Sequence, residues 1–154
     1  MKKHFTLLLC LLLFSTAILA QAKVKAIART PANTLQKLLT GTGLPFTVVN
    51  DSLAAIPYKS ENIPSYEVLI QQIGDLYIIY IELTKLLPGK IDDTKLKYLL
   101  QQNDHFDIIK IGLDSDNAVY VRADVYRANQ TATLLARIIK QVANVTNIIA
   151  GDLK

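Results

Sequence analysis

The sequence predicts an α+β domain in which an antiparallel sheet of five or six strands carries helices mainly on one face. Three observations predict this fold class. Residues 106–150 have, without a gap, the pattern of a strand, a tight turn, a second strand and a long amphipathic helix. Residues 66–83 have the alternation of two strands that meet at Gly74-Asp75. The connections have the length of hairpin loops, whereas a parallel sheet needs long crossovers.

The sequence of the first part of the domain predicts one helix followed by a pair of short strands. Thr30-Pro31 is an N-cap pattern, and Gly41 and Gly43 mark the end of a helix of about ten residues. Residues 45–50 and 53–58 are then predicted to form strands around a turn. The apolar stripe of the helix is Leu35, Leu38 and Leu39.

In the two central strands, one side of each is predicted to face the helices. Pro88-Gly89 ends this region, and Asp92 and Asp93 place negative charge at the start of a second helix. Three leucines of that helix are predicted to point inward: Leu96, Leu99 and Leu100. The strand residues predicted to face the helices are Tyr66, Val68, Ile70, Tyr77, Ile79 and Ile81.

The last part predicts a hairpin and a long helix. A strand at 107–113 and a return strand at 119–125 flank the turn Asp114-Ser115-Asp116-Asn117. The predicted order is therefore a helix, three or four strands, a helix, two strands and a helix. Apolar residues recur at three and four positions in the last helix, which predicts its buried face: Leu134, Leu135, Ile138, Ile139, Val142, Val145 and Ile149.

The N-terminus predicts export. Lys2-Lys3 is a short basic segment, residues 5–19 are almost purely apolar, and Ala20-Gln21-Ala22 supplies the small residues that a signal peptidase requires. The apolar segment is too short for a lasting membrane span. The sequence thus predicts a signal peptide at 1–22, a leader at 23–29 and a single domain at 30–154, in a periplasmic or extracellular location.

Removal of the signal peptide leaves 132 residues (154 minus 22), which is enough for one domain and too few for two. Cys10, the one cysteine, lies in the signal peptide without the small residue that precedes a lipidated cysteine, so neither a disulfide nor a lipid is expected. The 17 basic residues less Lys2 and Lys3 leave 15 against 13 acidic residues, a charge of about +2. This balance favours no polyanionic partner such as nucleic acid.

The chain resembles a known family in its pattern of apolar positions and turns. The resemblance rests on the segments TPANTLQKLL, GLPFTVV, IYIELTKLLPG, IDDTKLKYLLQQNDHF and IGLDSDNAVYVRADV. From about Thr30 to Asp152 the chain is similar to YbjN-like proteins, whose fold is that of type III secretion chaperones. The resemblance implies a small, often dimeric, non-enzymatic module, and the secretion chaperones bind extended segments of partner proteins. They work in the cytoplasm, so the predicted signal peptide is a departure from them.

The residues that carry chemistry do not predict an enzyme. Once the signal peptide is removed, His105 is the only histidine and no cysteine remains, so a Ser-His-acid triad would depend on that one residue. His105 ends a predicted helix, where histidine commonly interacts with terminal carbonyls. A zinc site draws several Cys or His ligands. We therefore expect no catalytic residue, no metal and no cofactor.

Other candidate motifs favour structural roles. The Asp114–Asn117 segment has a faint calcium-loop pattern, but Val125 stands where a bidentate glutamate is needed. The side chains of Asp92 and Asp93 point apart because they are adjacent on a helix, so they are poorly placed for acid–base catalysis. Acidic residues at the start of a helix commonly cap it. Gly41-Thr42-Gly43 lacks the third glycine and the preceding strand of a dinucleotide loop. Four lysines interleave with acids and are expected to form a solvated face: Lys85, Lys90, Lys95 and Lys97.

The predicted site is the face of the sheet that points away from the helices, called the open face below. Strand alternation sends apolar and aromatic side chains to it and borders them with charges, which is the composition of a binding surface. The alternative is that loops or a second copy of the chain cover this face. The predicted binding residues are Leu69, Ile78, Tyr80, Ile108, Tyr120 and Arg122, with Tyr126 on the same face and Glu67, Glu82 and Lys110 at its border.

Two classes of function follow. The first is an exported, non-enzymatic module that holds a protein or peptide partner on the open face or on an exposed sheet edge, and that forms a homodimer through that face or the neighbouring edge strand. The alternative is a small sensory or carrier domain that holds an apolar ligand between the sheet and the helices. An internal cavity would favour the carrier, and a filled core with an exposed aromatic face would favour the binding module.

Overall fold

The computed structural model describes residues 34–87 and 91–153. The predicted signal peptide, the leader and the Thr30-Pro31 cap lie outside these residues. Three helices are described: α2 (Thr34–Thr42), α3 (Asp93–Gln101) and α4 (Ala132–Asp152). The strands are β1 (Thr47–Asn50), β2 (Leu53–Tyr58), β3 (Tyr66–Ile73), β4 (Leu76–Glu82), β5 (Lys110–Leu113) and β6 (Val119–Tyr126). Short 3-10 helices are η1 (Leu83–Lys85), η2 (Gln102–His105) and η3 (Arg127–Asn129).

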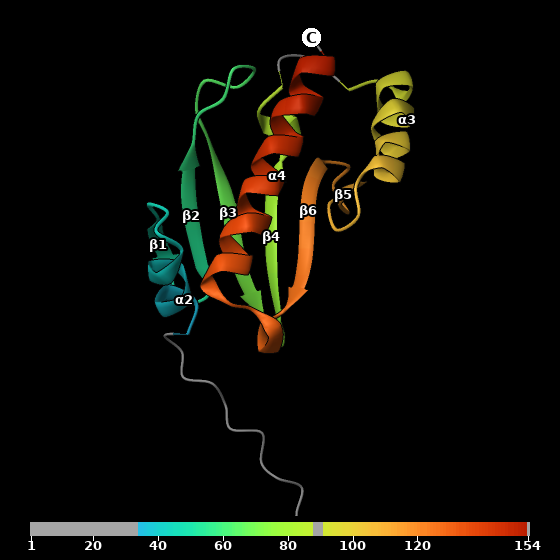
Figure 1. Cartoon of the computed structure of the whole chain (residues 1–154). Coiled ribbons are helices and arrows are strands. Elements are labelled where there is room, and N and C mark those ends of the chain that lie inside the picture. The colour runs from blue at the N-terminus through green and yellow to red at the C-terminus, as the bar shows by residue number, and fades with distance from the viewer. Residues whose placement is uncertain (1–33, 88–90, 154) are drawn as a thin grey trace, which may run out of the picture. The chain divides into compact units, whose positions relative to one another are not determined.

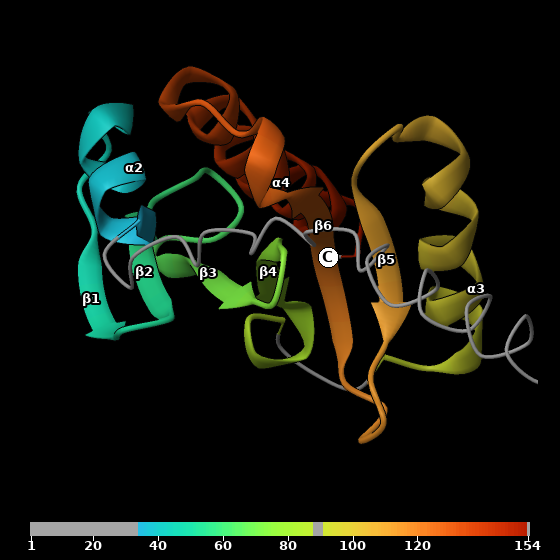
Figure 2. The same ribbon diagram turned by 90° about the horizontal axis from the view of Figure 1, so that it is seen from below.

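The strands form one sheet in the order β1-β2-β3-β4-β6-β5, and every neighbouring pair is antiparallel. Helix α4 crosses one face of this sheet over β3, β4 and β6, with α2 packed beside it (Figure 1). The view from below shows α2 and α4 on the same side of the sheet and α3 beside the β5 edge (Figure 2). The predicted α+β fold is confirmed, with four strands before α3 and two after it.

The core lies between α4 and the covered face of the sheet. Alternate residues of the strands point into it, so the predicted alternation of β3 and β4 is confirmed, and β6 follows the same pattern. Each of these core side chains is at most 5% exposed, so this layer is closed to solvent. The strand residues are Tyr66, Val68, Ile70, Tyr77, Ile79, Ile81, Val119 and Val121, and those of α4 include Leu135, Ile138, Ile139, Val142 and Val145.

Turns and helix starts follow from local chemistry. Gly74 has a φ of +53° in the turn between Ile73 and Leu76, a conformation that favours glycine. The Asp114 carboxylate accepts the backbone N–H groups of Asp116 (2.9 Å) and Ala118 (2.8 Å), which makes this segment a hairpin turn. The Asp92 carboxylate accepts the N–H of Lys95 at 2.9 Å and caps α3, as predicted.

The two edges of the sheet differ. At the β5 edge, the Asn103 side chain replaces a neighbouring strand: its Nδ2 donates to the Ile111 carbonyl (2.9 Å), and its Oδ1 accepts the Ile111 N–H (2.7 Å). At the other edge, all four residues of β1 are exposed. A capped edge resists pairing with another chain, whereas an uncapped edge invites it.

The prediction for α3 was wrong in one residue. Leu99 is buried and Leu96 packs partly against the core, but Leu100 is 45% exposed. Adjacent residues of an α-helix point about 100° apart, and α3 meets the sheet only at its β5 edge. A contact on one side of the helix buries Leu99 and leaves Leu100 in solvent.

Within residues 34–87 and 91–153, no helix has the length and apolar character needed to cross a membrane. The same residues contain no group of three or more His, Cys, Asp or Glu side chains placed to hold a metal ion.

Candidate functional site

The open face carries a row of side chains that runs across four strands. Leu69 of β3 pairs with Tyr80 of β4, Tyr80 pairs with Arg122 of β6, and Arg122 pairs with Lys110 of β5. Paired residues in an antiparallel sheet lie on the same face with their Cβ atoms about 5 Å apart. The row therefore runs from an apolar side chain through an aromatic ring to two cations.

Two further rows extend this patch toward the β3–β4 turn. In the first, Ile78 pairs with Asp124. In the second, Leu76 pairs with both Ile73 and Tyr126. Ile73 is 50% exposed and Tyr126 is 67% exposed, which makes them the most open large apolar side chains of this face. Sequence reasoning missed Ile73 and Leu76, although continuing the strand alternation up to the Gly74-Asp75 turn would have included both.

Tyr120 is held flat against the sheet. A Cβ atom added at Gly112, the residue opposite it on β5, would lie 2.6 Å from the Tyr120 hydroxyl oxygen, so the ring occupies the space above this glycine. The guanidinium carbon of Arg122 lies 5.8 Å from the centre of the same ring, within cation–π range. Gly112 and Arg122 together fix the position of this aromatic surface.

Charges border the patch and are partly paired. Arg122 donates to both oxygens of Asp124, with Nε–Oδ1 at 2.6 Å and Nη2–Oδ2 at 2.8 Å. These hydrogen bonds raise the pKa of Arg122 above its ordinary value. Glu82 pairs with Lys85 across one helical turn, and Glu67 is exposed. The patch thus has an apolar centre and a border of positively and negatively charged side chains.

Ile108 does not belong to the open face, so its predicted position was wrong. The strand predicted at 107–113 begins only at Lys110, and strand alternation does not apply to the irregular residues that follow η2. Ile108 is 45% exposed and lines a groove on the helix side of the sheet. The other five predicted residues, namely Leu69, Ile78, Tyr80, Tyr120 and Arg122, lie together on the open face.

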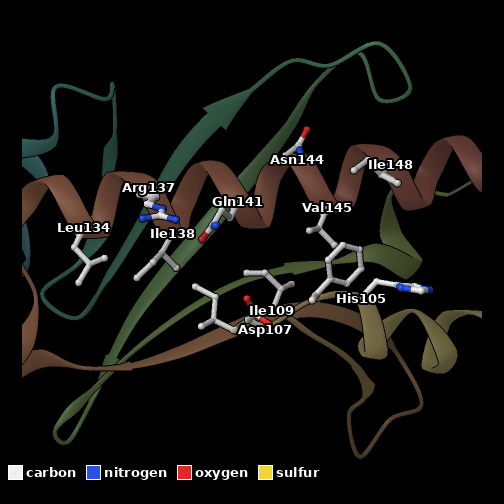
Figure 3. A pocket seen from close by; sticks show the side chains of 12 residues that line it. His105, Asp107, Ile109, Leu134, Arg137, Ile138, Gln141, Asn144, Val145 and Ile148 are labelled. Atoms are coloured by element: carbon white, nitrogen blue, oxygen red, sulfur yellow. The ribbon is translucent and has the colours of Figure 1, made fainter.

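That groove, called the α4 groove below, has a volume of about 480 Å³. In Figure 3, one wall is the row of side chains on α4 from Leu134 to Ile148, and the other is the connection from His105 to Ile109. Sequence reasoning did not anticipate it, because residues 107–109 were assigned to a strand. The signal that was available is Ile148, an isoleucine next to the predicted buried stripe of the last helix.

The comparisons with known proteins agree on the fold. Neither a protein-family model nor a curated protein sequence matches the chain. Among solved structures, YbjN from E. coli, which has been proposed as a transcription regulator, is 16% identical with a TM-score of 0.56, over 79% of this chain and 89% of YbjN. A chain of the heterodimeric ExoU–SpcU complex from the type III secretion system of Pseudomonas aeruginosa is 18% identical with a TM-score of 0.53, over 75% of this chain and 93% of its own length.

These two similarities confirm the fold that the resemblance implied. The chain has a YbjN-like fold that is shared with a component of a type III secretion complex. At 16% and 18% identity the similarity is one of backbone arrangement. Function is therefore argued from the side chains of this chain.

Proposed function

We propose that this protein is an exported, non-enzymatic module that binds a protein or peptide partner on its open face. The observation that carries the proposal is the continuous patch formed by Leu69, Ile78, Tyr80 and Tyr120, on the side of the sheet opposite to α2 and α4 (Figure 2). Solvent-facing apolar patches with a charged rim are typical of interaction surfaces.

The chemistry of the patch suits a protein partner. Tyrosine offers a large apolar surface with a hydroxyl at its tip; Tyr120 lies beside the Arg122 guanidinium, and Tyr80 is the cross-strand partner of Arg122. Tyrosine and arginine are the residues that most often dominate binding energies at interfaces. The described residues offer no comparable set for catalysis: His105 and Asp107 both line the α4 groove, but no serine, threonine or cysteine lines it to complete a triad.

The similar structures support this proposal in one respect. The ExoU–SpcU structure is a heterodimeric complex, so one chain with this fold is found bound to another protein. For the present chain, we propose either a separate protein or a second copy as the partner, with Tyr80 and Tyr120 at the centre of the contact. The uncapped β1 edge, with Val48 and Val49 exposed, is the neighbouring surface through which such a contact can extend.

Site-specific photocrosslinking tests the proposal. A photoreactive phenylalanine analogue at position 80 is expected to give a defined protein adduct in the exported fraction. The same analogue at Lys37, an exposed residue of α2 on the other side of the sheet, is the control and should give none. Equal adducts from both positions, or none from position 80, would contradict the proposed surface.

A homodimer is the specific form of the proposal that can be measured first. We expect sedimentation equilibrium to show a dimer at micromolar concentration, with Tyr80→Asp shifting the protein to monomer because a carboxylate is placed at the centre of the patch. Lys37→Asp serves as the control. A monomer at all concentrations would exclude the homodimer and leave a separate protein as the proposed partner. The mass of the crosslinked adduct at position 80 would then identify that partner.

Export is tested through the N-terminus of the secreted product. Because Ala20-Gln21-Ala22 satisfies the small-residue rule, we propose that the mature chain begins at Lys23 without acylation. Mass spectrometry of the exported protein is expected to show this start. A lipid on Cys10 would contradict it.

A further inference from the structure

Helix α4 presents an apolar seam that continues from its core-facing side to the α4 groove. Five of its residues line the α4 groove at successive spacings of four, three, four and three: Leu134, Ile138, Gln141, Val145 and Ile148. This is the heptad spacing with which one helix packs along another. Across the groove from this side of α4 lies the connection from His105 to Ile109 (Figure 3), while α2 is the helix with the most extensive contact to α4.

The seam has a buried floor and exposed rims. Ile138 and Val145 are at most 5% exposed and belong to the core, whereas Leu134 is 38% and Ile148 is 44% exposed. On the opposite wall, Ile108 is exposed to the same degree. Three of the exposed large apolar side chains of the described residues thus meet in one groove, and covering them would remove apolar surface from water.

The size of the groove indicates what fits it. A helix that runs from Leu134 to Ile148 spans about 21 Å and, at a diameter of about 10–12 Å, has a volume on the order of 2,000 Å³. The groove holds about 480 Å³ and is lined by α4 over this length, so it can receive side chains from one side of such a helix. The matching occupant inserts a single row of side chains and leaves its other faces in solvent.

Charge adds a second requirement. Arg137 is exposed on the rim of the groove and makes no ion pair with any residue that the structure describes. Lys140, one turn further along α4, is also exposed, and no acidic residue lies on α4 before Asp152. The one carboxylate of the groove, Asp107, lies on the opposite wall (Figure 3). The α4 rim therefore favours an occupant with negative charge on the side next to Arg137.

We propose that the α4 groove binds an amphipathic helix of a partner protein, with large apolar residues at heptad spacing in the groove and glutamate or aspartate opposite Arg137. Gln141 lies in the middle of the seam, where a polar residue sets the register of a helix pair. This proposal does not depend on the open face, which lies on the other side of the sheet.

Two synthetic helical peptides of 18 residues test the proposal on the full mature protein. Both carry leucine at heptad positions; one has glutamate and the other lysine at the flanking positions. Fluorescence anisotropy with labelled peptide is expected to show the glutamate peptide binding about tenfold more tightly than the lysine peptide, a difference of about 1.4 kcal/mol. Arg137→Glu should reverse this preference, which loss of folding cannot do.

A matched pair of variants separates the groove from general surface hydrophobicity. Ile148 and Leu100 are exposed to 44% and 45%, but only Ile148 lines the groove. Ile148→Ser is expected to weaken binding of the glutamate peptide at least about fivefold, whereas Leu100→Ser should change it less than about twofold. Both variants keep the fold because their side chains already contact water.

Three outcomes overturn the proposal. The first is equal affinity for the two peptides, or no binding of either peptide at a protein concentration of about 100 μM, which exceeds the dissociation constant expected of a specific contact. The second is binding of laurate that Ile148→Ser abolishes while neither peptide binds, which would make the groove a site for a small apolar ligand. The third is self-association that Ile148→Ser abolishes and Tyr80→Asp does not, which would assign the groove to a second copy of the chain.

Discussion

The two faces of the central sheet are made from alternate residues of the same strands, yet they differ in composition. In β3, Val68 and Ile70 point to α4 and are fully buried, while Glu67, Leu69 and Gln71 point the other way and are exposed or half-buried. A face covered by a helix must exclude groups that lose hydrogen bonds with water, so it is apolar throughout. The open face is under no such constraint, and the binding partner that we propose would account for its apolar residues.

Losing a single side chain also has different consequences on the two faces of the sheet. A buried side chain contacts many neighbours, and its loss leaves a cavity that the close-packed core cannot fill. A side chain on an open patch loses little in the free protein and contributes only when a partner excludes water from it. The predictions below separate these two behaviours, starting with the largest effect.

The largest effect is expected from truncation in the covered face. Ile139→Ala should lower the free energy of unfolding by about 2–4 kcal/mol, because Ile139 is fully buried on α4 and the substitution leaves a cavity. Ile148→Ala, the same change on the same helix at a residue that is 44% exposed, should cost less than about 1 kcal/mol. Urea denaturation measures both. Similar losses from the two variants would show that α4 does not bury the side assigned to it.

A smaller effect is expected from two stacked tyrosines that differ in one hydrogen bond. The ring centres of Tyr58 and Tyr66 lie 5.9 Å apart. The Tyr66 hydroxyl donates to the Ala143 carbonyl at 3.1 Å. The buried Tyr58 hydroxyl has no hydrogen-bond partner among the described residues. Tyr66→Phe should therefore cost about 1 kcal/mol, and Tyr58→Phe should be neutral or stabilising. Thermal unfolding of the two variants checks the order, and a larger loss for Tyr58→Phe would contradict it.

The same pair predicts a dependence on alkaline pH. Burial raises the pKa of Tyr58 and of Tyr66 above the ordinary value of 10.0. Since the unfolded chain then releases these protons at lower pH than the folded one, their contribution to stability is complete below pH 10 and is lost as the pH rises from there. The double variant Tyr58→Phe, Tyr66→Phe should lose less stability than the wild type between pH 9 and pH 11. Tyr126→Phe, at an exposed tyrosine, is the control and should follow the wild type.

Sequence reasoning predicted the covered face better than the site. Period-two alternation of Val68, Ile70, Ile79 and Ile81 has one physical cause, burial under a helix, and it located these residues correctly. Ile108 was misplaced because alternation says nothing about where a strand begins. In the structure η2 ends at His105 and the chain stays irregular until Lys110, beside the Asn103 side chain that caps β5. That cap is a tertiary contact with no sequence signal.

The α4 groove was out of reach for a related reason. Its apolar wall on α4 continues the pattern of a buried helix face, and a single helix gives no sign of which part of a wide apolar stripe the sheet will cover. Leu134 was predicted to be buried with Leu135, yet it is 38% exposed because α4 turns it toward the groove. Sequence gives the width of an apolar stripe, and only packing decides which part of it remains for a partner.

The smallest effect on stability, and the sharpest test of the comparison, is expected on the open face. Tyr80 is half-buried between Leu69 and Arg122, so Tyr80→Ala removes cross-strand contacts worth less than about 1 kcal/mol. Tyr120→Ala should cost a similar amount, since its half-buried ring lies over Gly112 and beside Arg122 on the open face. Both variants are expected to keep a melting temperature near that of the wild type and to lose association with the second copy or partner, as measured by sedimentation or crosslinking. If they instead unfold the protein as severely as Ile139→Ala while the remaining folded fraction associates normally, the open face is a structural surface and the proposed binding site is lost.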